Sequence, residues 1–548
     1  MIRSSISLSL LLALLFACGC VPNAQKQALD SITIGELATH MNFIASDETL
    51  GRDTPSQELN ITCRYLATYA EAYGLKPILP DGAYFQKIPV EVSKISETQT
   101  QLTISDNQQS QTFRCPFDFT AAGSSQDGAA SGDVVFLGLG INAPEQNWDD
   151  FGDLDLNGKI VVVLDAALPA DKQTQFRNPL RNRNTLARQK GAAAVLTVIN
   201  PDQENQFIQN DTTFPNNESM ARFRPDYYPA PSTSRSAPSA SRRPAASTNQ
   251  NPPMLQVQIR HHLAAALLDV TPQRLNEMFA QIGSGQQVPV QTFPQKTVKI
   301  NLKRLTRTTH TQSVIACLEG ADPILKNEYV VIGSHPDHVG VRNGQVYNGA
   351  DDNTSGCVAM LEIAQALMID RPKRSVIFGW FTGEEKGLMG SHVLASQSPV
   401  PIENISAMLN LDMICRNDTD HLYLVASNLL STELDASINK MNDQYTHFRL
   451  DYKYEDPNHP DRFYSRSDHY PYNLFGVPAV WLFCGTTPDY HTPNDTIDRV
   501  DYQKMLNATK LTYLVCCDIG NKPELLKLDA NPKITSRGKH NVATQLNR

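Results

Sequence analysis

The chain has 548 residues, of which 41% are hydrophobic and 19% are charged, and its formal net charge is −9. This composition is typical of a globular protein, and the length exceeds that of one ordinary hydrophobic core, so we expect two or three domains. The acidic balance argues against a nucleic-acid partner, because proteins that bind nucleic acid present a basic face.

The first 20 residues have the pattern of a targeting segment. Arg3 gives a positive start, and residues 6–17 form an apolar run that is too short for a stable transmembrane helix. The run ends in LFACGC, and a cysteine after small residues is similar to a bacterial lipobox. We therefore predict an exported protein anchored to a membrane of a bacterial cell envelope, periplasmic or at the cell surface, by a lipid on Cys18 or Cys20. An ordinary signal peptide with two incidental cysteines is the alternative.

Helical and extended patterns follow along the chain. Residues 33–90 predict helices and a turn, with an apolar helical stripe over 56–73 that stops at Gly74. Residues 97–115 alternate like edge strands. From residue 131 onward, short strand-like runs such as DVVFL and KIVVVL predict a small β-rich unit with its own core.

A segment of low complexity interrupts this β-rich unit. Residues 229–253 contain six Pro, six Ser and five Ala, a composition that cannot bury a core. We predict a disordered or polyproline-like loop, and we expect its deletion to leave the chemistry of the protein unchanged.

Four apolar runs in the second half of the chain predict strands of an open α/β sheet. They are YVVIGS at 329–334, SVIFGWFT at 375–382, ISAMLNL at 405–411 and VPAVWLF at 477–483. Polar residues lie at or soon after the ends of these runs, namely His335, Glu384, Glu385, Asp412 and His491. Because ligands bind beyond the carboxyl ends of the strands in such sheets, we expect these side chains to converge on one rim.

Together with Asp351 in the loop GADDNTSG, these residues have the composition of a two-metal hydrolytic site. Such a site needs one bridging carboxylate, plus an imidazole and a carboxylate for each ion, and it activates a water and polarises a carbonyl. Mixed histidine and carboxylate ligands suit Zn²⁺. Each motif alone is usually a surface turn or a capped strand end, so the ordered set carries the prediction.

Two pairs of adjacent acids support this interpretation. Asp351 and Asp352 are neighbours, which is costly unless a cation lies between them. Glu384 and Glu385 leave a strand in different directions, so one of them can hold a metal while the other faces the water.

The motif series HPDHVG, NGADDNTSG, FTGEEKGLMGS, LNLDM, RSDHYPY and YHTPNDT resembles that of the di-zinc aminopeptidase family, metallopeptidase family 28. The stretch SDETLGRDTPSQE is similar to the N-terminal segment of that family, and the β-rich unit, with LDLNGKIVVVL and RQKGAAAVL, resembles a protease-associated domain. The resemblance implies an α/β fold with a mixed central sheet and helices on both faces. It places the catalytic domain at 33–112 and 296–522, the insert at 113–295 and a polar tail at 523–548.

The resemblance also implies roles for individual residues. Asp351 would bridge two Zn²⁺ ions, with His335 and Asp412 completing one site and Glu385 and His491 the other. Glu384 would be the general base. The peptide bond between Asp351 and Asp352 would be cis.

Residues around this set have expected roles by the same resemblance. Asp337 would orient the imidazole of His335. Tyr490 matches a residue that stabilises an oxyanion in some members, and Arg466 matches a residue of the substrate pocket; a core tyrosine and a surface salt bridge are the alternatives. His338 and His469 have no ligand position left, so we predict that both are structural.

The expected activity is hydrolysis of N-terminal residues from peptides by a zinc exopeptidase. A carboxypeptidase of the same family would need a basic pocket for the substrate carboxylate, and the sequence shows no clear one. A dipeptidase of the family is a further alternative. A glutaminyl cyclase would use one zinc, which the five-ligand set argues against. A catalytically inactive surface binding protein on the same fold remains the alternative from another class, although such proteins usually lose ligands or the base.

Overall fold

The computed structural model describes residues 24–106, 109–122, 127–216, 218–222, 254–342 and 344–536. The predicted targeting segment, 1–20, and the predicted loop, 229–253, lie outside these residues. Within the described residues, no helix is both long enough and apolar enough to cross a membrane.

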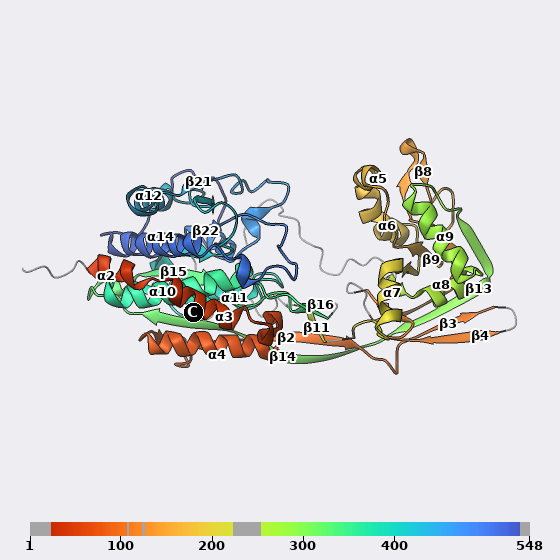
Figure 1. Ribbon diagram of the computed structural model, residues 1–548, viewed down its shortest axis with the longest axis horizontal. Helices are drawn as coiled ribbons and strands as arrows, with labels where there is room; N and C mark the ends of the chain where they lie inside the picture. Colours follow the sequence, from red (N-terminus) through yellow and green to blue (C-terminus); the bar gives the residue numbers. More distant parts are fainter. Residues whose placement is uncertain are drawn as a thin grey trace, which may run out of the picture. The chain divides into compact units, whose positions relative to one another are not determined.

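The chain forms two compact units (Figure 1). The first contains the described residues of Met1–Val90, Arg222–Thr233 and Thr308–Arg548, and the second contains those of Glu91–Ala221 and Ser234–Arg307. The second unit is therefore larger than the predicted insert at 113–295. The reason is strand pairing: β3 (Gln101–Ser105) pairs with both β4 (Ser110–Arg114) and β13 (Gln291–Leu302), so residues assigned by sequence to the first unit complete the sheet of the second.

An eight-stranded sheet builds the second unit, in the order β4-β3-β13-β6-β9-β10-β12-β5. The remaining strands are β6 (Gly128–Phe136), β9 (Ile160–Leu164), β10 (Ala194–Val198), β12 (Leu255–Ile259) and β5 (Phe119–Ala121). Its helices are α5 (Ala170–Gln175), α6 (Arg177–Gln189), α7 (Pro201–Gln209), α8 (His261–Leu268) and α9 (Pro272–Gly283). The runs DVVFL and KIVVVL overlap β6 and β9, and their alternate apolar residues enter two separate apolar clusters, as expected of strands that are buried on both faces.

A ten-stranded sheet, most of whose strands lie in the first unit, has the order β11-β2-β14-β18-β15-β19-β22-β20-β21, with β1 paired to β14. Its strands are β1 (Lys76–Pro77), β2 (Phe85–Ile95), β11 (Ser219–Arg222), β14 (Arg304–Leu318), β15 (Tyr329–Ser334), β18 (Ser375–Trp380), β19 (Ile405–Leu411), β20 (His421–Val425), β21 (Arg449–Asp451) and β22 (Ala479–Phe483). Neighbouring strands of the group β18-β15-β19-β22 are all parallel, whereas β14 and β20 flank them in antiparallel pairs. The predicted mixed sheet is confirmed.

Helices cover both faces of this sheet (Figure 1). The larger apolar cluster joins the sheet to α2 (Ala24–Ser31), α3 (Ile34–Ile44), α4 (Gln57–Ala72), α10 (Ser355–Ile369), α12 (Thr432–Met441) and α14 (Tyr502–Asn521). The opposite cluster joins it to α11 (Met389–Ser396) and α13 (His469–Leu474). Along β15, Val330 and Ile332 enter the first cluster and Val331 enters the second, because successive strand side chains alternate between faces.

The parallel group positions the candidate site. Parallel strands end at one edge of the sheet, and each of the four central strands is followed there by a loop that carries polar residues predicted from the sequence. Strands β15 and β19 have the predicted ends, whereas β18 ends at Trp380 and β22 begins at Ala479.

Candidate metal centre

The predicted site residues come together at the carboxyl edge of the parallel strands. His335 directly follows β15, Asp412 directly follows β19, and Glu384 and Glu385 lie four and five residues beyond the end of β18. His491 is carried by the loop after β22, where its backbone is left-handed, with φ 54°. Residues separated by about 150 positions in the sequence therefore share one rim, as the strand pattern predicted.

Asp352, not Asp351, lies between the histidines of this rim. One carboxylate oxygen of Asp352 is 3.7 Å from Nε2 of His335, and the other is 3.1 Å from Nε2 of His491. Asp351 points elsewhere: its carboxylate accepts hydrogen bonds from the backbone N–H and the thiol of Cys415 at 3.0 and 3.2 Å. Among the described residues, Asp351 belongs to neither group of candidate ligands, so its assignment as the bridging residue is wrong by one position.

The backbone of this loop explains the error. The carboxylate of Asp495 accepts the N–H groups of both Asp351 and Asp352, at 2.9 and 3.0 Å. This fixes the turn so that the two side chains leave it in different directions. The cis peptide bond of the loop joins Asp352 to Asn353, and not Asp351 to Asp352 as expected.

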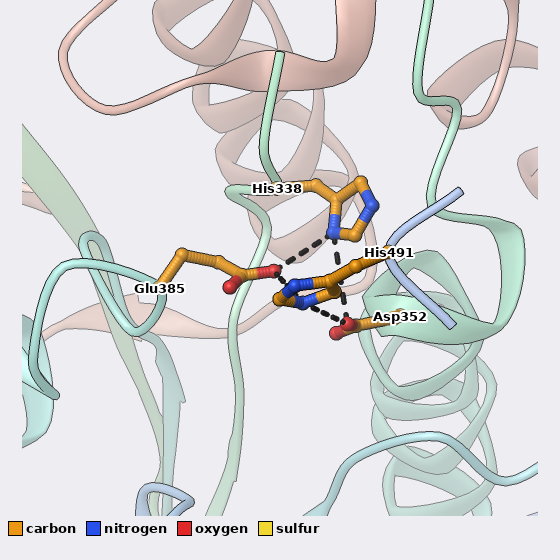
Figure 2. Close-up of side chains that lie close together, drawn as sticks. All are labelled: His338, Asp352, Glu385 and His491. Carbon is orange, nitrogen blue, oxygen red and sulfur yellow. Dashed lines mark hydrogen bonds and ion pairs between the residues drawn. The ribbon is translucent and has the colours of Figure 1, made fainter. Parts of the chain in front are cut away.

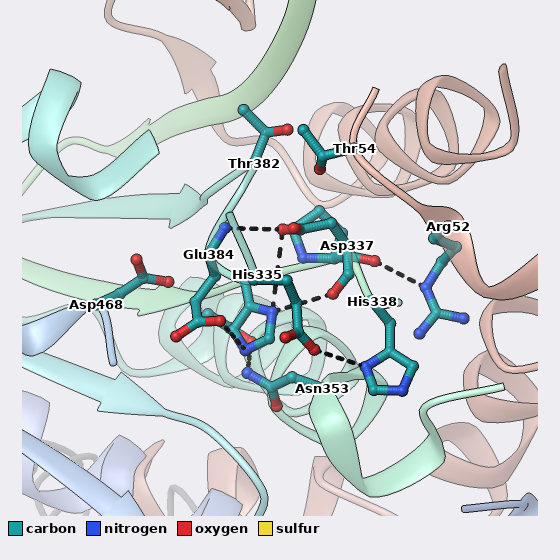
Figure 3. Close-up of polar contacts among 12 residues, drawn as sticks. Arg52, Thr54, His335, Asp337, His338, Asn353, Thr382, Glu384 and Asp468 are labelled. Atoms are coloured by element: carbon teal, nitrogen blue, oxygen red, sulfur yellow. Dashed lines mark hydrogen bonds and ion pairs between the residues drawn. The ribbon is translucent and has the colours of Figure 1, made fainter. Parts of the chain in front are cut away.

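The first group of candidate ligands consists of His335, Asp412 and Glu384. Figure 3 shows His335 and Glu384 of this group. Nε2 of His335 lies 3.3 Å from a carboxylate oxygen of Asp412 and 4.0 Å from one of Glu384. The other ring nitrogen of His335 contacts the backbone carbonyl of Asp337 at 3.1 Å. When that nitrogen carries the proton, the lone pair of Nε2 faces the acids, which is the tautomer that a metal ligand needs.

The second group consists of His338, Asp352, Glu385 and His491 (Figure 2). Nδ1 of His338 is 2.9 Å from Oε1 of Glu385, and Nε2 of His491 is 3.1 Å from the same oxygen. His338 is fully buried and takes part in this group, so its prediction as a purely structural residue does not fit the geometry. His469 lies in neither group and packs against Trp481, at 5.7 Å between ring centroids.

The donor set fits divalent cations. Four acids of the two groups, Asp352, Glu384, Glu385 and Asp412, are largely withdrawn from solvent, which is costly for carboxylates without a cation between them. Within the described part of the chain, Nε2 of His335, Nε2 of His491 and Oδ1 of Asp412 are buried without a hydrogen-bond partner. Buried polar atoms of this kind are rare unless a ligand satisfies them, and imidazole with carboxylate suits Zn²⁺.

Glu384 and Glu385 are neighbours with opposite electrostatics. Burial raises the pKa of Glu384 well above its usual range, and His335 only partly opposes this. Burial also acts on Glu385, but the close contacts of its carboxylate with His338 and His491 hold its pKa well below the usual range. A carboxyl group with a raised pKa is suited to accept and return a proton, whereas one held ionised is suited to bind a cation.

Asp337 contacts both halves of this arrangement (Figure 3). Its carboxylate accepts the backbone N–H of Glu384 at 3.2 Å, and it lies 4.0 Å from Nδ1 of His335. Asp337 therefore positions Glu384 through its carboxylate. It also contacts the ring of His335, as predicted, but mainly through its backbone carbonyl.

Tyr490 and Arg466 lie together at the edge of the centre. The guanidinium of Arg466 donates to the hydroxyl of Tyr490 at 3.0 Å, and the ring of Tyr490 stacks on that of His491 at 3.9 Å between centroids. Both residues line a cavity of about 270 Å³ that also contains Asp352, Glu384, Glu385 and Asp412. The other walls are mainly apolar and include Met413, Phe463, Trp481 and Phe483.

One comparison with known protein families matches the part of the chain that carries this site. Residues 313–515 match peptidase family M28. They contain every candidate ligand.

The fold resembles two solved aminopeptidases. One is an aminopeptidase from Aneurinibacillus sp. strain AM-1, with 19% identity, a TM-score of 0.51, and coverage of 94% of this chain and 100% of that chain. The other is a zinc aminopeptidase from Bacillus subtilis, with 17% identity, a TM-score of 0.51, and coverage of 90% and 97%. At these identities, the likeness establishes the fold.

Curated relatives are similar over a shorter region. A probable leucine aminopeptidase from Arthroderma otae is 30% identical over 200 residues, which are 34% of this chain and 53% of the relative. Leucine aminopeptidase 1 from Trichophyton rubrum is 28% identical over 214 residues, 36% of this chain and 55% of the relative. The chain thus spans about half the length of the curated relatives it matches.

Arg52, which lies outside the matched M28 region, supports the metal-centre loops and was not singled out from the sequence. Its guanidinium is fully buried and donates to the carbonyls of Pro336 at 2.7 Å and Asn348 at 2.8 Å. It also reaches the carbonyls of Ile44 and Gly349. The loops that carry His335 and Asp352 are therefore tied to one cation. Arg52 lies in the motif SDETLGRDTPSQE. That motif indicated a resemblance to the family, but it did not indicate what Arg52 contacts.

We expect Arg52→Lys to weaken both folding and zinc binding. A single ammonium cannot replace the planar fork of donors, and each buried carbonyl left without a donor costs roughly 1–3 kcal/mol. The melting temperature and the zinc content of the purified protein measure the two effects. Arg64→Lys, at an exposed position of α4, is the matched control. Unchanged zinc content in Arg52→Lys would contradict the role of Arg52 in the metal centre.

Proposed function

We propose that the chain is a zinc-dependent aminopeptidase that uses two Zn²⁺ ions and Glu384 as its general base. The observation that supports this most is the pair Glu384 and Glu385. Glu384 has a raised pKa, and its contact with His335 is as long as 4.0 Å. Glu385 is held ionised between two imidazoles, and both acids line one cavity.

The residues present would hold two ions. His335, Asp412 and one oxygen of Asp352 would serve one ion, and His491, Glu385 and the other oxygen of Asp352 would serve the second. Bound zinc supplies an acidified water and polarises the carbonyl of the scissile bond. Asp352 takes the bridging role that the resemblance had assigned to Asp351.

The chain's own groups then move the proton. Glu384 accepts it from the attacking water and later returns it to the leaving amine, a use that its raised pKa favours. Asp337 fixes Glu384 through its backbone N–H. The hydroxyl of Tyr490, oriented by Arg466, donates toward the oxygen on which negative charge develops.

The cavity walls support an apolar side chain at the substrate's N-terminus. Met413, Phe463, Trp481 and Phe483 offer no charge to a polar side chain, and about 270 Å³ suits one side chain rather than a long peptide. The acids of the centre would attract the free α-amine beside it. One observation favours a second candidate, a carboxypeptidase or dipeptidase: Arg466 is exposed at the same cavity and could pair with a substrate carboxylate.

Substrates with free and blocked N-termini test the proposal. We expect hydrolysis of leucyl anilides and little hydrolysis of their acetylated forms, because the carboxylates would face an uncharged group, at a cost of roughly 1–3 kcal/mol. A chelator should abolish the activity and added Zn²⁺ should restore it. Equal rates on both substrates would contradict an aminopeptidase, and a requirement for a free C-terminal carboxylate, lost in Arg466→Gln, would favour the second candidate.

Export and a lipid anchor at Cys18 or Cys20 belong to this proposal, with the second unit as a protease-associated domain. Replacing each cysteine by Ala and following membrane association of the full chain in a bacterial host tests the anchor.

A further inference from the structure

We infer that His338 is a direct ligand of one of the two ions, so that this ion has four protein ligands and the other has three. The inference rests on the proposed two-metal function and adds a sixth ligand to it. The geometry of the second group supports ligation by His338, because four ligand atoms from four different residues lie within 4.8 Å of one another.

The separations fit a tetrahedral site. Four ligands at 2.0–2.1 Å around Zn²⁺ lie about 3.3 Å from one another. Nδ1 of His338 is 2.9 Å from Glu385 and 3.7 Å from Asp352, and Nε2 of His491 is 3.1 Å from each of the same two carboxylates (Figure 2). These four distances lie on both sides of the separation of about 3.3 Å expected between ligand atoms. One ion at the centre would therefore contact all four atoms.

The position of the His338 ring is fixed by its surroundings. The side chain is fully buried, and its backbone N–H donates to the carbonyl of Arg52 at 3.3 Å. The ring packs against Gly349, where an added Cβ would lie 2.6 Å from it. Glycine at 349, with φ 59°, therefore leaves the space that the ring occupies beside Asp352.

Among the residues that the structure describes, no second histidine joins the other group. Within 4 Å of Nε2 of His335, the carboxylate oxygens come from Asp412, Asp352 and Glu384, and Glu384 is the farthest of these, at 4.0 Å. If Glu384 acts as the base, this ion keeps an open position. Catalytic zinc sites keep three protein ligands and an open position, whereas closed sites have four. The ion beside His335 would thus hold the reactive water, and the ion beside His491 would be held more tightly.

Cobalt and zinc binding to the full chain test this inference. In His338→Cys the new thiol is attached close to the place of Nδ1. We expect the Co²⁺-loaded variant to show a thiolate-to-cobalt charge-transfer band in the near ultraviolet that is absent from Co²⁺-loaded wild type. His310→Cys, at an exposed position of β14, should show no such band.

A second variant separates ligation from hydrogen bonding. His338→Asn keeps an N–H donor toward Glu385 but is a poor zinc ligand. We expect it to lose affinity for one of two Zn²⁺ ions by more than the roughly 10–100-fold that an outer contact is worth. Wild-type affinity in His338→Asn, or no new band in His338→Cys, would overturn ligation by His338. If wild type binds two Zn²⁺ and cleaves peptides in that case, the proposed function stands; if it binds no zinc, both fail.

Discussion

Replacing Glu384 by Gln should lower kcat by roughly 10²–10⁴-fold while the protein keeps its zinc, because general-base catalysis is typically worth that much. Glutamine has the shape of a protonated glutamate but cannot accept the proton. Burial already favours the protonated form of Glu384, so the substitution should disturb the fold little. Steady-state kinetics and zinc content, measured on one preparation, check the two parts of this expectation.

The neighbouring residue provides the contrast. Glu385 is held ionised by His338 and His491, so Glu385→Gln removes a charge that these imidazoles and a cation would share. We expect this variant to lose zinc and, with it, activity. Added Zn²⁺ should then restore part of the activity of Glu385→Gln but none of that of Glu384→Gln. Near-normal turnover in Glu384→Gln would remove Glu384 from the mechanism.

The sequence predicted the framework of the site well, because that framework depends on apolar runs. Four buried strands gave a strong pattern, and parallel strands end at one edge of a sheet, so His335, Asp412 and His491 could be placed together without coordinates. The pattern of alternating or continuous apolar residues predicts where each strand lies, and the ends of the strands predict where the site lies.

What the sequence could not predict depends on backbone turns and on long-range packing. Asp351 and Asp352 are chemically identical neighbours, and only the turn held by Asp495, a residue about 140 positions away, decides which carboxylate faces the histidines. His338 was set aside because the expected ligand set was full, whereas its role follows from its distance to Glu385. Arg52 contacts the site loops through their backbone carbonyl oxygens. Every residue has such a carbonyl, so the sequence does not indicate which of them Arg52 contacts.

The two adjacent acids give the most direct test of the corrected assignment. Asp352→Asn should lose both zinc ions, because a neutral amide cannot bridge two cations between His335 and His491. We expect zinc affinity to fall by more than the roughly 10–100-fold typical of an outer contact, with activity falling in parallel. Zinc content after dialysis and calorimetric titration of the metal-free protein measure the loss.

Asp351→Asn is the matched control one residue away. Burial raises the pKa of Asp351 to about 7, so its carboxyl is already partly protonated near neutral pH, and asparagine resembles that form. Oδ1 of Asp351 accepts from the backbone N–H and the thiol of Cys415, and Oδ2 accepts from the thiol of Cys484. The carbonyl oxygen of asparagine can keep the two contacts with Cys415, and only the contact with Cys484 changes. We expect Asp351→Asn to retain two zinc ions and activity within roughly tenfold of wild type, since it disturbs only the support of the loop. Loss of zinc in Asp351→Asn together with its retention in Asp352→Asn would reverse the assignment, because the bridging charge would then lie on the residue that the structure turns toward the two cysteines.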